Sequence, residues 1–190
     1  MNAPRAARVL SEVLSPPYLI AAAATTAALV STTGMRAVAA VGTAMLFGAV
    51  IPLTYIARQV RSGRLTDRHI TRVRAQRHRP LAVALVSLSV GMALLWLIDA
   101  TAPAQVFTAT VVVLVPCMII TVWWQISIHC AVAAVITTYA AVHWDSWWAA
   151  GFVAVAALAW ARVTVNAHTV AQVVAGSAIG VILAAVTAVW

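Results

Sequence analysis

The sequence predicts an all-α membrane protein, a polytopic bundle of about six to seven transmembrane helices in a single integral membrane domain over residues 1–190. The first observation is the composition: 64% of the residues are hydrophobic and only 8% are charged. A soluble domain has roughly 25% charged residues. The second is that apolar stretches of about 20 residues recur, the length that crosses a bilayer as a helix. Helices satisfy their own backbone hydrogen bonds in lipid, so these stretches are expected to be helical.

Seven apolar segments follow one another along the chain: 18–35, 38–57, 81–98, 105–124, 126–142, 147–162 and 168–189. An N-terminal segment, residues 1–17, precedes the first of them and ends at Pro16-Pro17. Short turns join the segments in pairs, at Gly34 to Arg36, Asp99 to Pro103 and His143 to Ser146. This spacing predicts helical hairpins, with the longer connection 58–80 between the second and third segments.

The connection 58–80 is a basic loop. The formal net charge of +8 comes from twelve arginines and four acidic residues, and eight of those arginines lie in this loop. Arginine-rich loops of membrane proteins lie in the cytoplasm, where they meet anionic lipid. Because the charge sits between apolar segments, membrane lipids are the expected partners and nucleic acid is not. Counting crossings places the loop and the turns 125–128 and 163–167 on one face of the cell membrane, predicted to be cytoplasmic.

Polar residues gather at helix starts on this same face. Arg79 precedes Pro80, a residue suited to a first helical turn. Ser127 is placed to cap the next helix on this face, and His168 opens the last one. Helix N-termini bind phosphate because their N–H groups and dipole ends favour anions. Ionisable groups are costly in a membrane protein, so this set indicates a functional site.

Three short patterns occur in order between residues 72 and 180. They are Arg72 with Arg79-Pro80, Ser127-Ile128-His129, and Arg162 with His168 and Gln172. They resemble, in this order, the KxxxxxxRP, PSGH and SRxxxxxHxxxD motifs of the type 2 phosphatidic acid phosphatase superfamily. The resemblance implies the helical membrane fold of that superfamily, with residues 72–180 as the motif core.

The resemblance also implies a reaction. His168 would be the nucleophile and His129 the general acid, while Gln172, at the position of the motif's aspartate, would orient His168. The phosphate would be held by four residues: Arg72, Arg79, Ser127 and Arg162. The expected function is therefore an integral membrane phosphatase that hydrolyses a lipid or isoprenoid (di)phosphate through a phosphohistidine, with no metal and no cofactor.

Departures from the motifs keep other functions open. Gln172 supplies no negative charge to an imidazolium, and Ile126 and Ile128 replace the proline and glycine of the second motif. The same pocket could ionise a prenyl diphosphate, as a lyase or terpene cyclase does, with Trp124 and Trp160 as a substrate wall that stabilises a carbocation. A non-catalytic membrane protein that binds lipid phosphate is the third alternative.

Gly176 and Gly180 form a GxxxG motif in the last apolar segment. Small residues at this spacing allow two helices to approach closely. The motif predicts packing within the bundle, and a homodimer through Gly176 and Gly180 is the alternative.

Overall fold

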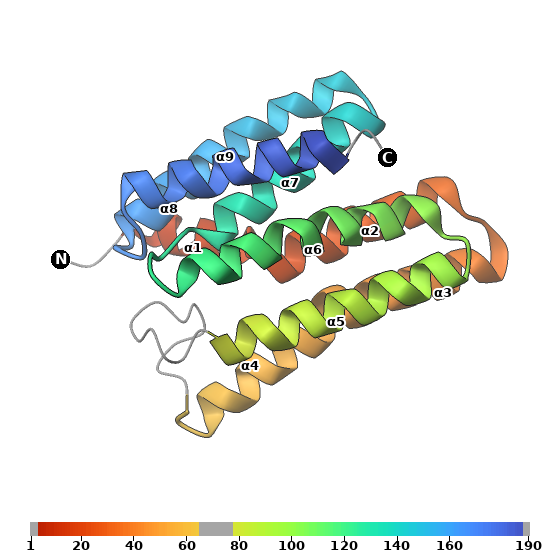
Figure 1. Cartoon of the computed structure of the whole chain (residues 1–190), viewed down its shortest axis with the longest axis horizontal. Helices are drawn as coiled ribbons and strands as arrows, with labels where there is room; N and C mark the ends of the chain where they lie inside the picture. The colour runs from red at the N-terminus through yellow and green to blue at the C-terminus, as the bar shows by residue number, and fades with distance from the viewer. Residues whose placement is uncertain (1–3, 65–77, 188–190) are drawn as a thin grey trace. The chain divides into compact units, whose positions relative to one another are not determined.

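The computed structural model describes residues 4–64 and 78–187, and every regular element in these ranges is a helix (Figure 1). In chain order the elements are α1 (Arg5–Val13), α2 (Pro16–Ser31), α3 (Gly34–Met45), η1 (Leu46–Val50), α4 (Ile51–Arg61), α5 (His78–Leu97), α6 (Thr101–Thr121), α7 (Ile128–His143), η3 (Ser146–Gly151), α8 (Phe152–Thr164) and α9 (Val170–Thr187). All seven predicted apolar segments are helical, and the all-α prediction is confirmed for the part of the chain that the structure describes.

Five helical stretches are long and apolar enough to cross a membrane: Gly34–Arg61, His78–Leu97, Thr101–Thr121, Ser146–Thr164 and Val170–Thr187. A sixth is added if α1 and α2, which are bent by 47° relative to each other, form one span. Helix α7 is apolar but has only 16 residues, which is short for a bilayer core. The described residues therefore provide five to six candidate spans, rather than the six to seven predicted.

The chain divides into two compact units. The first unit contains Met1–Leu19 and Val112–Trp190, and the second contains Ile20–Val111. The boundaries fall inside α2 and α6, so both helices belong partly to each unit. The sequence predicts one membrane domain, and each unit is described separately below.

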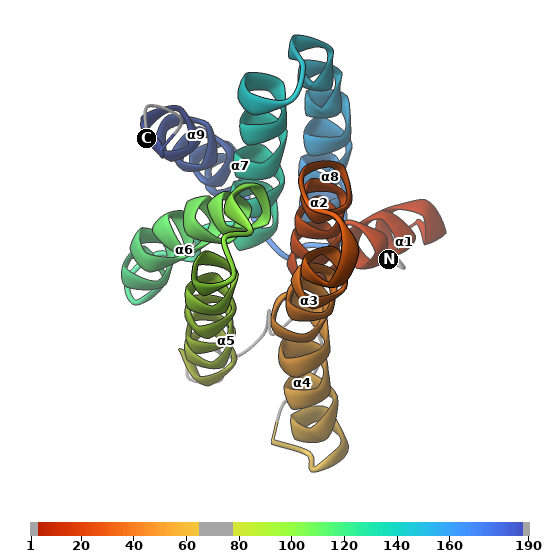
Figure 2. The same cartoon turned by 90° about the vertical axis from the view of Figure 1, so that its right-hand side faces the viewer.

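In the first unit, α7, α8 and α9 lie beside one another and α1 packs against α8 (Figure 2). Helices α7 and α9 approach closely because Gly176 and Gly180 have no Cβ, which would meet the main-chain carbonyls of Ser127 and Ala131 respectively. Both glycines are buried by these contacts. The GxxxG motif thus packs two helices of the same chain, as small residues do in membrane bundles. Homodimerisation remains a prediction.

In the second unit, the helical stretch from α3 to α4 contains a π-helical turn at η1, just before Pro52. In this turn the N–H of Ile51 donates to the carbonyl of Leu46, five residues earlier. The same register would pair the carbonyl of Phe47 with residue 52, but proline has no N–H. The hydroxyl of Ser87 on α5 donates to this carbonyl at 2.8 Å. Ser87 therefore donates to the Phe47 carbonyl in place of the N–H that Pro52 does not have.

We expect Ser87→Ala to lower the free energy of unfolding by about 1 kcal/mol, because it removes the hydroxyl from a buried carbonyl. Unfolding by SDS titration, followed by tryptophan fluorescence, measures the change. Ser62→Ala is the matched control, because the Ser62 hydroxyl donates to the carbonyl of Gln59 at an exposed position. Equal stability of the two variants would contradict the role given to Ser87.

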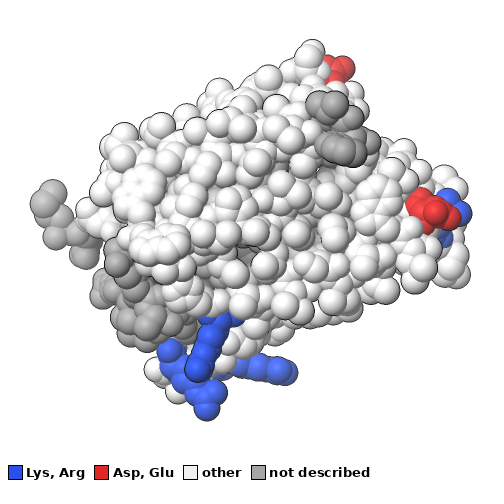
Figure 3. All heavy atoms as spheres, in the orientation of Figure 1, with Lys and Arg blue, Asp and Glu red and all other residues white. Residues whose placement is uncertain are grey.

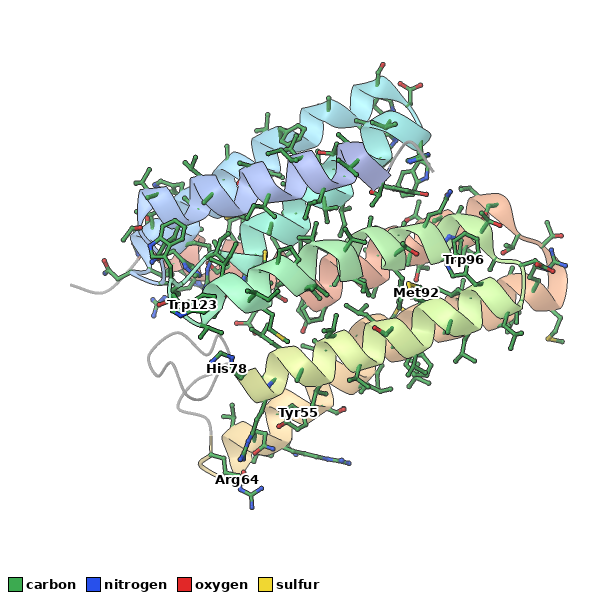
Figure 4. All side chains as sticks on the ribbon, in the orientation of Figure 1. Tyr55, Arg64, His78, Met92, Trp96 and Trp123 are labelled. Atoms are coloured by element: carbon green, nitrogen blue, oxygen red, sulfur yellow. The ribbon has the colours of Figure 1, made fainter. Side chains whose placement is uncertain are left out.

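Arginines gather at one end of the second unit. Arg58 and Arg61 lie in the last turn of α4, and Arg64 and Arg79 are exposed close to the two ends of the basic loop. Figure 3 shows them as a blue group at one end of α4 and α5, and Figure 4 places Arg64 and His78 there and Trp96 towards the other end of α5. Asp99 follows the far end of α5, and Figure 3 shows a smaller blue group beside the red atoms there. Such an asymmetry is what the positive-inside rule describes, while the cytoplasmic face remains a prediction.

Candidate functional site

Two turns of the first unit meet beside the starts of α7 and α9. The side-chain amide of Gln125 donates to the carbonyl of Ala167 at 3.2 Å. Nδ1 of His168 lies 3.2 Å from the main-chain oxygen of Gln125. The N–H of Ser127 donates to the carbonyl of Gln172 at 3.2 Å. The segments that carry the second and third motif-like patterns are therefore hydrogen-bonded to each other.

The contact with Gln125 determines which nitrogen of the His168 ring carries the proton. A carbonyl oxygen can only accept, so a hydrogen bond at Nδ1 requires the proton to be on Nδ1. In the neutral ring Nε2 then carries the lone pair. Nε2 is thus the nitrogen of His168 that can act as a nucleophile or base.

Gln172 takes part in a helix cap. Its side-chain Oε1 accepts from the N–H of Thr169 at 3.0 Å, and the Thr169 hydroxyl accepts from the N–H of Gln172 at 3.3 Å. This reciprocal pair is a capping box at the start of α9. Gln172 thus caps α9, and the carbonyl of Gln125 contacts the His168 ring. The role of Gln172 in orienting His168 remains a prediction.

Arg162 lies in the last turn of α8 and is the largest side chain that the first unit buries almost completely, with 1% of its surface exposed. The hydroxyls of Ser127 and Ser177 lie within hydrogen-bonding reach of the Cys130 thiol, and the guanidinium is close enough to influence the charge of that thiol. Arginine stays charged when buried and matches phosphate with two parallel hydrogen bonds. Arg162 therefore brings a permanent positive charge into the core beside the start of α7.

The turn from α8 to α9 is closed by the main chain. The carbonyl of Arg162 accepts from the N–H of Ala167 at 3.0 Å and from that of His168 at 3.3 Å. Asn166 has a φ of 55°, a left-handed conformation that asparagine tolerates better than most residues after a helix end. This turn sets His168 directly before α9.

Ser127 and His129 belong to the start of α7. Ser127 is fully buried, and its hydroxyl accepts from the N–H of Cys130 at 3.5 Å, as expected of an N-cap. His129 is partly buried in the first helical turn. The starts of α7 and α9 thus lie in the same unit and present helix N-termini to this region, an arrangement that favours a bound anion.

The other predicted site residues lie elsewhere. Arg79 is exposed in the first turn of α5, in the second unit, and Arg72 lies outside the described residues. Their convergence with the residues of the first unit remains a prediction. Trp124 and Trp160 are 40% and 50% exposed, as interfacial tryptophans commonly are, and their role as a substrate wall also remains a prediction. The described residues contain no group of three or more His, Cys, Asp or Glu that could hold a metal ion.

Comparison with known proteins finds no matching family model, no similar curated protein and no similar solved structure. The function is therefore inferred from the site residues and their contacts.

Proposed function

We propose that the chain is an integral membrane enzyme that hydrolyses a lipid or isoprenoid (di)phosphate, with His168 as the nucleophile. One observation carries the proposal: Nδ1 of His168 is held at 3.2 Å by the main-chain oxygen of Gln125, which makes Nε2 the lone-pair nitrogen. The buried Arg162 and the starts of α7 and α9 support it, because a guanidinium and the positive ends of two helix dipoles belong to the same unit.

The proposed reaction has two steps. Nε2 of His168 attacks phosphorus, and the bond from phosphorus to the leaving oxygen breaks while His129 donates a proton to that oxygen. His129 then takes a proton from water, whose oxygen attacks phosphorus and displaces His168, releasing phosphate. Arg162 and Ser127 would hold the phosphate oxygens, whose negative charge is spread in the transition state. The membrane would supply the apolar part of the substrate.

A specific observation favours a second function, ionisation of a prenyl diphosphate. The group that contacts Nδ1 of His168 is a neutral carbonyl, and Gln172 is engaged in the capping box. Neither supplies the negative charge that would stabilise the imidazolium formed when His168 attacks phosphorus. Ionisation needs only positive charge around the leaving diphosphate, and the allylic cation, directly or after cyclisation, would then lose a proton to the departing diphosphate and give a terpene hydrocarbon.

Purified protein in lipid nanodiscs, incubated with phosphatidic acid, a prenyl monophosphate and a prenyl diphosphate, tests the proposal. We expect release of inorganic phosphate together with diacylglycerol from phosphatidic acid, the free alcohol from the prenyl monophosphate and the prenyl monophosphate from the prenyl diphosphate. Release of diphosphate together with a hydrocarbon would assign the lyase or cyclase function instead. Saturable binding without any product would identify a non-catalytic binder of lipid phosphate.

A further inference from the structure

We propose that Gln125 is a positioning residue that holds His168 in a single orientation and tautomer. The inference rests on the proposed function, because it concerns the residue assigned there as the nucleophile. It deepens that proposal by identifying the group that makes Nε2 the reactive nitrogen, a group that lies outside all three motif-like patterns.

Gln125 contacts two consecutive residues through two different groups. Its side-chain amide donates to the carbonyl of Ala167 at 3.2 Å, and its main-chain carbonyl lies 3.2 Å from Nδ1 of His168. One contact fixes the main chain of the turn before α9, and the other fixes the ring carried by that turn. Together they define both the position and the rotation of the imidazole.

The main chain on both sides of Gln125 is itself fixed in place. The N–H of Ile126 donates to the carbonyl of Trp124 at 2.8 Å, which folds the chain tightly around Gln125. Ile126 and Ser127 are 2% and 0% exposed, so the chain directly after Gln125 is fixed in the interior of the first unit. A carbonyl anchored in this way cannot follow a rotating ring, and the imidazole must adjust to it. A preorganised support of this kind holds a reactive group in productive geometry.

The side chain of Gln125 can be changed without removing the carbonyl that contacts His168. Gln125→Leu keeps the approximate volume but cannot donate to Ala167, so the turn should shift relative to the carbonyl. Because this contact acts on the reacting group and not on substrate binding, we expect kcat to fall about 10- to 100-fold while KM changes little. Gln125→Met keeps the approximate length of the side chain, loses the amide donor and adds no charge, and it should show the same effect if Gln125→Leu folds poorly.

The tautomer is measured independently of turnover. In protein labelled with ¹⁵N-histidine, nitrogen chemical shifts distinguish Nδ1–H from Nε2–H rings, and His168→Asn assigns the His168 signals. We expect His168 to be the Nδ1–H tautomer in the original protein and a mixture in Gln125→Leu. Gln59→Leu, the same change on α4 of the second unit, should leave the signals and the turnover unaltered.

The outcomes separate the two proposals. An Nε2–H ring in the original protein, or an unchanged tautomer and kcat in both Gln125 variants, would overturn the role of Gln125. The original protein could turn over no phosphate substrate and still have His168 as the Nδ1–H tautomer, with a mixture of tautomers in Gln125→Leu. In that case the positioning role stands and the phosphatase proposal fails.

Discussion

His168→Asn is expected to abolish hydrolysis of the phosphate substrate, with a loss of about 10⁴-fold or more in kcat. The proposed reaction forms a bond between Nε2 and phosphorus, and asparagine has no comparable nucleophile. Removing a nucleophile or its base typically leaves only the rate enhancement that binding and charge provide. Rapid acid-free quenching with ³²P-labelled substrate should trap a phosphohistidine in the original protein and none in the variant.

His143→Asn is the matched control. His143 lies in the last turn of α7, where its ring stacks on Tyr139 with 4.3 Å between centroids, so it belongs to the opposite end of the helix from His129. Its replacement should leave kcat within about two-fold, since the residue is outside the site. If His168→Asn retains turnover while remaining folded, phosphohistidine catalysis is wrong, and diphosphate ionisation becomes the leading function.

The helical segments can be predicted because their signal is local. A run of about 20 apolar residues in lipid has few alternatives to a helix. Helix α1 is not among the predicted apolar segments, although its sequence carries a signal of another kind. The apolar residues Ala7, Leu10 and Leu14 (the C-cap) recur at helical spacing, and Ala7 is buried together with the small Ser11 on the same side. The hydrogen bond that Ser87 donates to the π-helical turn cannot be predicted in this way, because Ser87 lies on another helix, 40 residues away in sequence.

In the site, too, local patterns can be predicted from the sequence and tertiary contacts cannot. The capping box is predictable from Thr169 and Gln172, which have the required residue types and spacing. That local pattern is sufficient to assign Gln172 to the helix start. The contact between Gln125 and His168 has no such signal, because any residue has a main-chain carbonyl and its direction depends on the tertiary fold.

Gly176→Ala is expected to lower the free energy of unfolding by about 1–3 kcal/mol, the usual cost of overpacking a tight contact. A Cβ at this position would meet the main-chain carbonyl of Ser127, and backbone cannot move aside as a flexible side chain can. Helices α7 and α9 would have to separate, which would strain the hydrogen bond from Ser127 to Gln172. Turnover should therefore fall along with stability. SDS titration and the phosphate-release assay measure the two effects.

Gly42→Ala isolates the packing contribution. Gly42 is exposed on α3, and a Cβ there would have no neighbour within 4 Å. Alanine favours a helix over glycine by roughly 0.5–1 kcal/mol, so this variant should be as stable as the original protein or slightly more stable. Because the amino-acid change is the same, the difference between the two variants measures the contact with Ser127. If Gly176→Ala matches Gly42→Ala in stability and turnover, the close approach of α7 and α9 does not hold the site together.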